Sequence, residues 1–76
     1  MAQMIKIGND LLRISPADPR KIEISFTNGL SWTVRYHGGF NVGSFMDLEA
    51  DGKNIIGYTD KGVFVSKPGY TVFMRK

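Results

Sequence analysis

The stretch SFTNGLSW, residues 25–32, decides the fold, because it separates two segments in which apolar and polar side chains alternate. These segments are residues 21–26 and residues 30–37. Strict alternation is typical of β-strands that bury one face. We therefore predict an antiparallel hairpin with its turn inside this stretch.

The length of the turn sets which side chains face each other. Asn28-Gly29 favours a two-residue loop, but that loop would place Phe26 opposite Ser31. A three-residue loop, Thr27-Asn28-Gly29, with Gly29 at positive φ as a bulge, places every apolar residue on one side. We predict this bulged loop, with Phe26 and Trp32 in the core and with Glu23 within reach of Arg35. The expected pairs are Phe26 with Leu30, Ile24 with Trp32 and Ile22 with Val34.

Alternating segments continue along the chain and predict further strands at residues 3–7, 11–15, 44–49, 54–59, 63–66 and 70–75. Turn residues separate them, and Asp60-Lys61-Gly62 is expected to form a second three-residue loop with a left-handed Gly62. No window keeps the apolar spacing of an amphipathic helix. We predict a single all-β domain over residues 1–76: an antiparallel meander of short strands and tight hairpins, built as propeller-blade-like sheets or as a small sandwich or barrel.

The composition sets limits on stability and location. A chain of 76 residues buries only about 60% of the surface that its unfolded form exposes. It has no cysteine, so neither a disulfide nor a thiolate metal site can compensate for a small core. No basic start followed by a long apolar run is present. We expect a cytoplasmic, soluble protein without a membrane segment.

An internal repeat is suggested by an offset of 41 residues, which sets Ser25 beside Ser66 and Ile22 beside Val63. It relates residues 4–36 to residues 45–76, and a period near 40 with about four short strands per unit is typical of β-propeller blades.

The hairpin also resembles the Asp-box (BNR-type) repeats of sialidase-type, sortilin-type and photosystem-assembly-type propellers, whose turn reads Ser-x-Asp-x-Gly-x-Thr-Trp. Thr27 stands where that motif has Asp, and the residues that match are Ser25, Gly29, Ser31 and Trp32. A degenerate second copy contains Ser66, Gly69 and Thr71. The resemblance implies one and a half to two blades and a structural role for the turn, with no catalytic residue.

Few residues suggest catalysis. His37 is the only histidine, and neither a second histidine nor a cysteine is available for a metal site. Asp47, Glu49 and Asp51 alternate on one strand, which indicates an acidic strand face more than a calcium loop. We expect no enzyme activity, no metal and no cofactor, with a small hydrolase that uses Asp47 or Glu49 as the alternative.

Candidate binding residues fall into two groups. The segment around Gly38-Gly39 is rich in groups that can hold a ligand, namely Tyr36, His37, Phe40 and Asn41. Aromatic residues interleaved with basic ones could stack on unpaired bases, and the basic residues of this nucleic-acid alternative are Arg35, Lys61, Lys67 and Arg75. Phe64 is expected to face outward, toward another chain, if Val63 and Val65 face inward.

These features predict a non-catalytic binding or assembly module that associates with itself or with another protein. The alternative is a small basic β-barrel that binds RNA or single-stranded DNA. The net charge of +3 is about what solubility alone would give a small domain. The basic residues are scattered in runs of at most two, so the charge gives only modest support for nucleic-acid binding.

Overall fold

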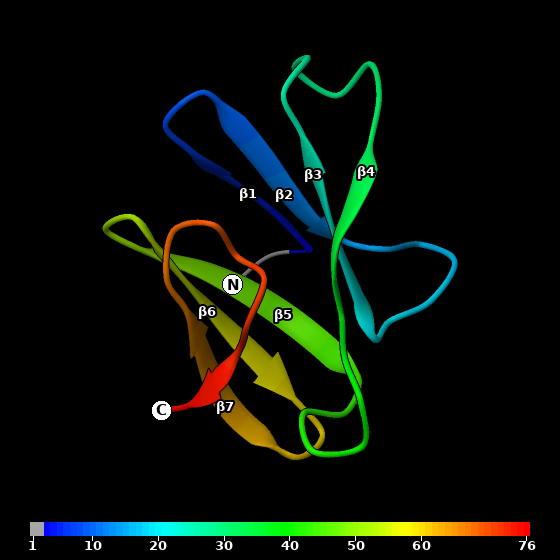
Figure 1. Ribbon diagram of the computed structural model, residues 1–76, viewed down its shortest axis with the longest axis vertical. Helices are drawn as coiled ribbons and strands as arrows, with labels where there is room; N and C mark the ends of the chain where they lie inside the picture. Colours follow the sequence, from blue (N-terminus) through cyan, green and yellow to red (C-terminus); the bar gives the residue numbers. More distant parts are fainter. Residues whose placement is uncertain (1–2) are drawn as a thin grey trace.

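Two antiparallel sheets of four strands each make up the computed structural model, which describes residues 3–76 (Figure 1). The first sheet has the order β1-β2-β3-β4 and the second the order β5-β6-β7-β8. The strands are β1 (Met4–Ile7), β2 (Asp10–Ile14), β3 (Lys21–Ser25), β4 (Thr33–His37), β5 (Phe45–Asp51), β6 (Asn54–Thr59), β7 (Gly62–Ser66) and β8 (Met74–Arg75). The all-β prediction is confirmed, and each predicted strand has a counterpart, but β4 begins at Thr33 and not at residue 30, and β8 covers only Met74–Arg75 of the predicted 70–75.

Each sheet is a meander in which every strand pairs with the next one along the chain. Two-residue turns join β1 to β2 and β5 to β6, because Ile7 lies opposite Asp10 and Asp51 lies opposite Asn54. Short turns of this kind allow only antiparallel neighbours. The local sequence between the strands therefore determines the strand order of both sheets.

The core lies between the two sheets and takes side chains from both. Ile22 and Leu48 are completely buried within it. Three aromatic rings meet there, with the centroid of Phe73 lying 4.7 Å from that of Tyr36 and 5.0 Å from that of Phe45. The other buried members are Leu12, Ile14, Ile24, Val42, Ile55, Phe64 and Tyr70.

The β3–β4 hairpin differs from the predicted register. The structure pairs Ile24 with Thr33 and Ile22 with Tyr36, with a bulge next to Ile22. β3 ends at Ser25 and β4 begins at Thr33, so Phe26 lies beyond the paired region and is 60% exposed. The expected pairing of Phe26 with Leu30, and the core position of Phe26, are therefore wrong.

The turn itself follows the Asn-Gly rule. Asn28 has φ of 58° and Gly29 has φ of 93°, and the amide of Leu30 donates to the carbonyl of Thr27 at 3.3 Å. Two successive positive φ values are those of a type I′ turn. The positive φ of Gly29 is confirmed. The predicted type I turn with a bulge is wrong. Residues 26–32 form a loop outside the paired strands, so the turn does not have to place apolar side chains opposite each other.

Two predictions about β7 are also corrected. Thr59 pairs directly with Gly62, so the second loop has two residues, although Gly62 does have a positive φ of 133°. Phe64 is buried in the core instead of facing outward. It pairs with Gly57, and the missing side chain at Gly57 leaves room on the inner face for aromatic rings.

The two sheets share a strand order, but β3 and β7 bury only some of the same positions. Ile22 and Ile24 are buried in β3, whereas Phe64 and Ser66 are buried in β7. The offset of 41 residues aligns buried Ile22 with Val63, which is only partly buried, but it also aligns Ser25 with Ser66, both of which are buried. An internal duplication stays a prediction.

The sheet edges differ in how well they are covered. β1 lies against β5, where the Gln3 side chain donates to the carbonyl of Met46, and β8 is only two residues long. β4 pairs with β3 alone, and none of its five residues is buried. Among residues 3–76, β4 is therefore the long edge strand with the least cover.

Candidate functional site

Hydroxyl groups organise the turn after β3. The Oγ atom of Ser25 accepts hydrogen bonds from the amides of Gly29, at 2.9 Å, and of Thr27, at 3.3 Å. The Oγ1 atom of Thr27 accepts from the amide of Ser31 at 3.0 Å. Thr27, at the position where the Asp-box motif has Asp, therefore supplies a hydrogen-bond acceptor inside the turn.

Trp32 follows this turn and lies outside the core cluster, partly buried. The guanidinium carbon of Arg13 lies 4.1 Å from the centroid of its ring, and the Nε atom of Arg13 is 2.7 Å from Glu23 Oε1. Glu23 thus pairs with Arg13, and the predicted contact with Arg35 is wrong. The register explains this, since Glu23 lies directly opposite Arg13 on β2.

The four predicted ligand-binding residues lie close in sequence but do not surround a common cavity. The Tyr36 ring packs into the core, and this burial raises the pKa of its hydroxyl. His37 is exposed, with its Nε2 atom 3.9 Å from Asp18 Oδ2. Phe40 is 91% exposed, and Asn41 beside it is exposed as well. The two pockets described below are lined by none of these four residues.

The turn that carries Phe40 is held firmly in place. At its base, the amide of Gly38 donates to the carbonyl of Arg20 at 2.7 Å, and the amide of Gly43 donates to the carbonyl of Gly39 at 3.1 Å. The amide of Ser44 donates to Asp60 Oδ1 at 2.8 Å, which ties the segment to the β6–β7 turn. Val42 is buried. Phe40 is therefore an exposed side chain on an ordered support.

The acidic residues of β5 lie along one strand. Glu49 accepts a hydrogen bond from the Tyr58 hydroxyl at 2.8 Å, and this bond raises the pKa of Tyr58. Among residues 3–76 no group of three or more His, Asp and Glu side chains is placed to hold a metal ion. The Glu49 carboxylate thus makes a cross-strand hydrogen bond with Tyr58 on the neighbouring strand β6.

The basic residues proposed for nucleic acid are spread over both sheets. Arg35 lies on β4, with its guanidinium carbon 5.6 Å from the centroid of the Phe26 ring. Arg75 Nη1 donates to the carbonyl of Lys61 at 3.2 Å, so these two residues lie together. Lys67 follows the far end of β7. The structure brings Lys61 and Arg75 together and leaves the other two apart.

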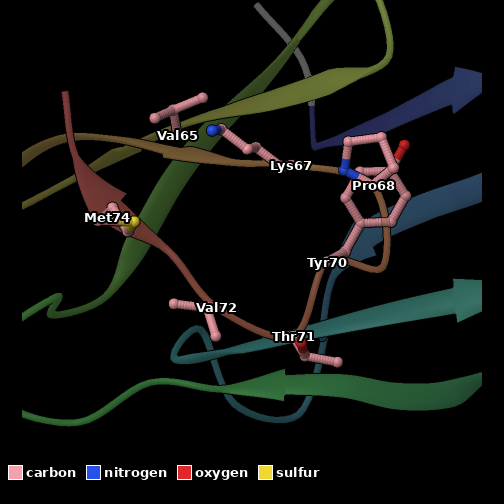
Figure 2. A pocket seen from close by; sticks show the side chains of 7 residues that line it. All are labelled: Val65, Lys67, Pro68, Tyr70, Thr71, Val72 and Met74. Atoms are coloured by element: carbon pink, nitrogen blue, oxygen red, sulfur yellow. The ribbon is translucent and has the colours of Figure 1, made fainter.

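A pocket that the sequence did not indicate lies between β7 and β8. Figure 2 shows its side chains, which come from both arms of the bend that joins these strands. Its volume is about 190 Å³, and its wall is largely apolar, with the Lys67 side chain as the one charged member. We call it the C-terminal pocket; it is lined by Val65, Lys67, Pro68, Tyr70, Thr71, Val72 and Met74.

Hydrogen bonds hold the bend around this pocket. The Ser66 hydroxyl donates to the carbonyl of Val72 at 2.7 Å, and the Tyr70 hydroxyl donates to the carbonyl of Lys53 at 2.6 Å. Burial raises the pKa of Tyr70, and the charge of Asp10 raises it further. The sequence features in this segment, a predicted strand at residues 70–75, the basic Lys67 and the degenerate motif copy with Ser66, Gly69 and Thr71, do not indicate a pocket.

A second pocket of about 340 Å³ lies on the other side of Tyr70 and Pro68. The β1–β2 turn and Lys53 complete its wall, which contains Asp10 and Asn9. Tyr70 therefore separates two surface hollows, one apolar and one more polar.

Comparisons with protein families, with curated proteins and with solved structures give no match for this chain. Within residues 3–76 no helix is long and apolar enough to cross a membrane. What the chain does must therefore be inferred from its own geometry.

Proposed function

We propose that this chain is a non-catalytic assembly module that associates with further copies of itself in the cytoplasm. The observation that carries the proposal is the placement of the two most exposed large apolar side chains in the part of the chain that the structure describes. Leu30 is 90% exposed and Phe40 is 91% exposed, and both occupy hydrogen-bonded turns at the two ends of β4. Full exposure of such side chains forgoes about 1.5–3 kcal/mol each that burial would supply.

The ordered turns favour binding over accidental exposure. A side chain on a rigid support loses little conformational entropy when a partner covers it. The β4 edge between the two turns also presents unpaired backbone groups, which can pair with another chain. Val34 on this strand is exposed as well. Turns and edge together form one border of the molecule that lacks cover within residues 3–76.

The hairpin chemistry supports an assembly role. In the resemblance to Asp-box propellers the turn is structural, and the hydroxyl of Thr27 here accepts the hydrogen bond of Ser31 that a carboxylate could otherwise accept. We propose that the β3–β4 turn is a degenerate element of this type, and that it serves to present Leu30. The absence of cysteine is compatible with the reducing cytoplasm.

The test is the mass of the purified chain, measured by light scattering over a range of concentrations. We expect a multimer whose mass falls in the double variant Leu30→Ser/Phe40→Ser and stays unchanged in Lys6→Ser, which alters an exposed polar position. A monomer at every concentration would refute self-assembly.

A second candidate function is the binding of RNA or single-stranded DNA. Two arginine–aromatic stacks favour it, Arg13 on Trp32 and Arg35 on Phe26, since bases stack on such platforms. The basic residues do not form one continuous track, which weakens it. Binding to a labelled single-stranded oligonucleotide at low salt should be lost as the salt concentration rises, and no binding at low salt would reject this function.

A further inference from the structure

The C-terminal pocket has a size that suits one side chain. Its volume is about 190 Å³, below the roughly 300–1,000 Å³ of common cofactor and drug-like sites. An apolar protein cavity of about 150 Å³ accepts benzene. The pocket can therefore take a single phenyl ring.

Its wall chemistry also suits a phenyl ring. Val65, Val72 and Met74 line it with apolar groups, and Val72 and Met74 are largely exposed in the free chain. Lys67 is the charged member of the lining, and it makes no ion pair with a carboxylate among residues 3–76. An ammonium group beside an aromatic face is attracted by the π electrons, which favours phenyl over an aliphatic side chain.

The chain itself carries a matching ring. Within residues 3–76, Phe40 is the most exposed large apolar side chain, and it projects from a turn that Val42 and the Ser44–Asp60 hydrogen bond hold in place. A preorganised aromatic side chain that enters a pocket is the usual anchor of a protein interface.

Phe40 cannot reach the pocket of its own chain. Its turn is tied to Asp60 at one end of β6, whereas Tyr70 of the pocket is bonded to Lys53 at the other end of β6. Six residues of strand separate these points by about 20 Å. Figure 1 agrees, because the green segment after β4 and the orange segment after β7 lie at opposite ends of the second sheet.

We propose that Phe40 of one copy inserts into the C-terminal pocket of the next copy, so that the chain assembles head to tail. This inference rests on the proposed function of self-assembly and names its interface. Such a contact uses two different surfaces of the same chain, and it therefore generates rings if the rotation closes and filaments if it does not.

The test uses two variants, each of which removes one half of the contact. Phe40→Ala removes the ring and leaves the pocket, whereas Val72→Glu places a charge in the pocket and leaves Phe40. Each alone should be monomeric, with the dissociation constant raised at least about 30-fold, as expected when an aromatic anchor is truncated. An equimolar mixture should form a dimer and no larger species, because one intact ring and one intact pocket remain.

Controls separate this inference from the proposed function. Lys6→Ser, at an exposed polar position, should keep the wild-type mass, and circular dichroism melting should show that both test variants are folded. If the wild type is a multimer but either test variant keeps the wild-type mass, or if the mixture stays monomeric, this interface is wrong while self-assembly stands. A monomeric wild type would overturn both.

Discussion

The Oγ atom of Ser25 lies 2.9 Å from the amide nitrogen of Gly29 and accepts its hydrogen bond. Ser25 is the last residue of β3 and is buried, so this contact joins the end of a core strand to the apex of the next turn. It fixes the direction in which the turn leaves the sheet. The exposed position of Leu30 depends on that direction.

Replacement of Ser25 by Ala should destabilise the fold. The amides of Gly29 and Thr27 would lose their acceptor, and the loss of a hydrogen bond costs about 0.5–1.5 kcal/mol. Urea denaturation would measure the change in the free energy of unfolding. Ser31→Ala is the matched control, because Ser31 is exposed, and it should change stability by less than about 0.5 kcal/mol. Equal losses in the two variants would contradict a special role for Ser25.

Gly29→Ala should destabilise the turn through the backbone. Gly29 has φ of 93°, and a residue with a Cβ loses about 1 kcal/mol there. Space is not the cause, since the added Cβ would be 3.7 Å from Leu11 Cδ1. Asn28→Gly, one position earlier at φ of 58°, should change thermal stability little. A larger loss in Asn28→Gly than in Gly29→Ala would argue against the type I′ turn.

Gly57→Ala should destabilise the core through overpacking. A Cβ at this position would lie 2.6 Å from Phe45 Cε1 and 3.3 Å from Phe73 Cε2. Forcing a methyl group into a packed core costs about 1–3 kcal/mol. Gly39→Ala is the control, because nothing lies within 4 Å of its added Cβ. Calorimetry should show a lower melting temperature for Gly57→Ala only. An unchanged melting temperature for Gly57→Ala would mean that the rings of Phe45 and Phe73 can move aside at little cost in free energy.

Asp18→Asn should change how stability depends on pH. The backbone amide of Arg20 donates to the Asp18 carboxylate, and this bond, with the side chain of Arg20, lowers the pKa of Asp18 below 3.8. A lowered pKa in the folded state stabilises the fold above the unfolded-state value, and this stabilisation is lost as the pH falls through the folded-state value.

The wild type should therefore melt at a higher temperature than Asp18→Asn when the pH is above 3.8. The difference should shrink as the pH falls from that value through the lower folded-state pKa of Asp18, below which the Asp18 side chain is neutral like that of Asn. Melting curves across this range, recorded at constant salt, provide the measurement. A difference that is constant at all pH values would show that the charge of Asp18 does not contribute.

The strands could be predicted from the sequence because their signals are local. Alternation in residues 21–25 and in residues 33–37, with turn residues between them, requires no knowledge of the rest of the chain. The same holds for the positive φ at Gly29. The candidate site could not be found in this way. The C-terminal pocket depends on a hydrogen bond from Tyr70 to Lys53, which are far apart in the sequence and have no pattern that links them.

The sequence by itself determined that this protein is an all-β meander, because side-chain alternation and turn residues act over a few positions. Only the tertiary structure decided which way Phe26 and Phe64 face. Phe26 lies past the end of its paired strand and is exposed, while Phe64 is buried opposite Gly57. Burial depends on the volume that distant residues leave free, and that volume exists only once the two sheets have packed.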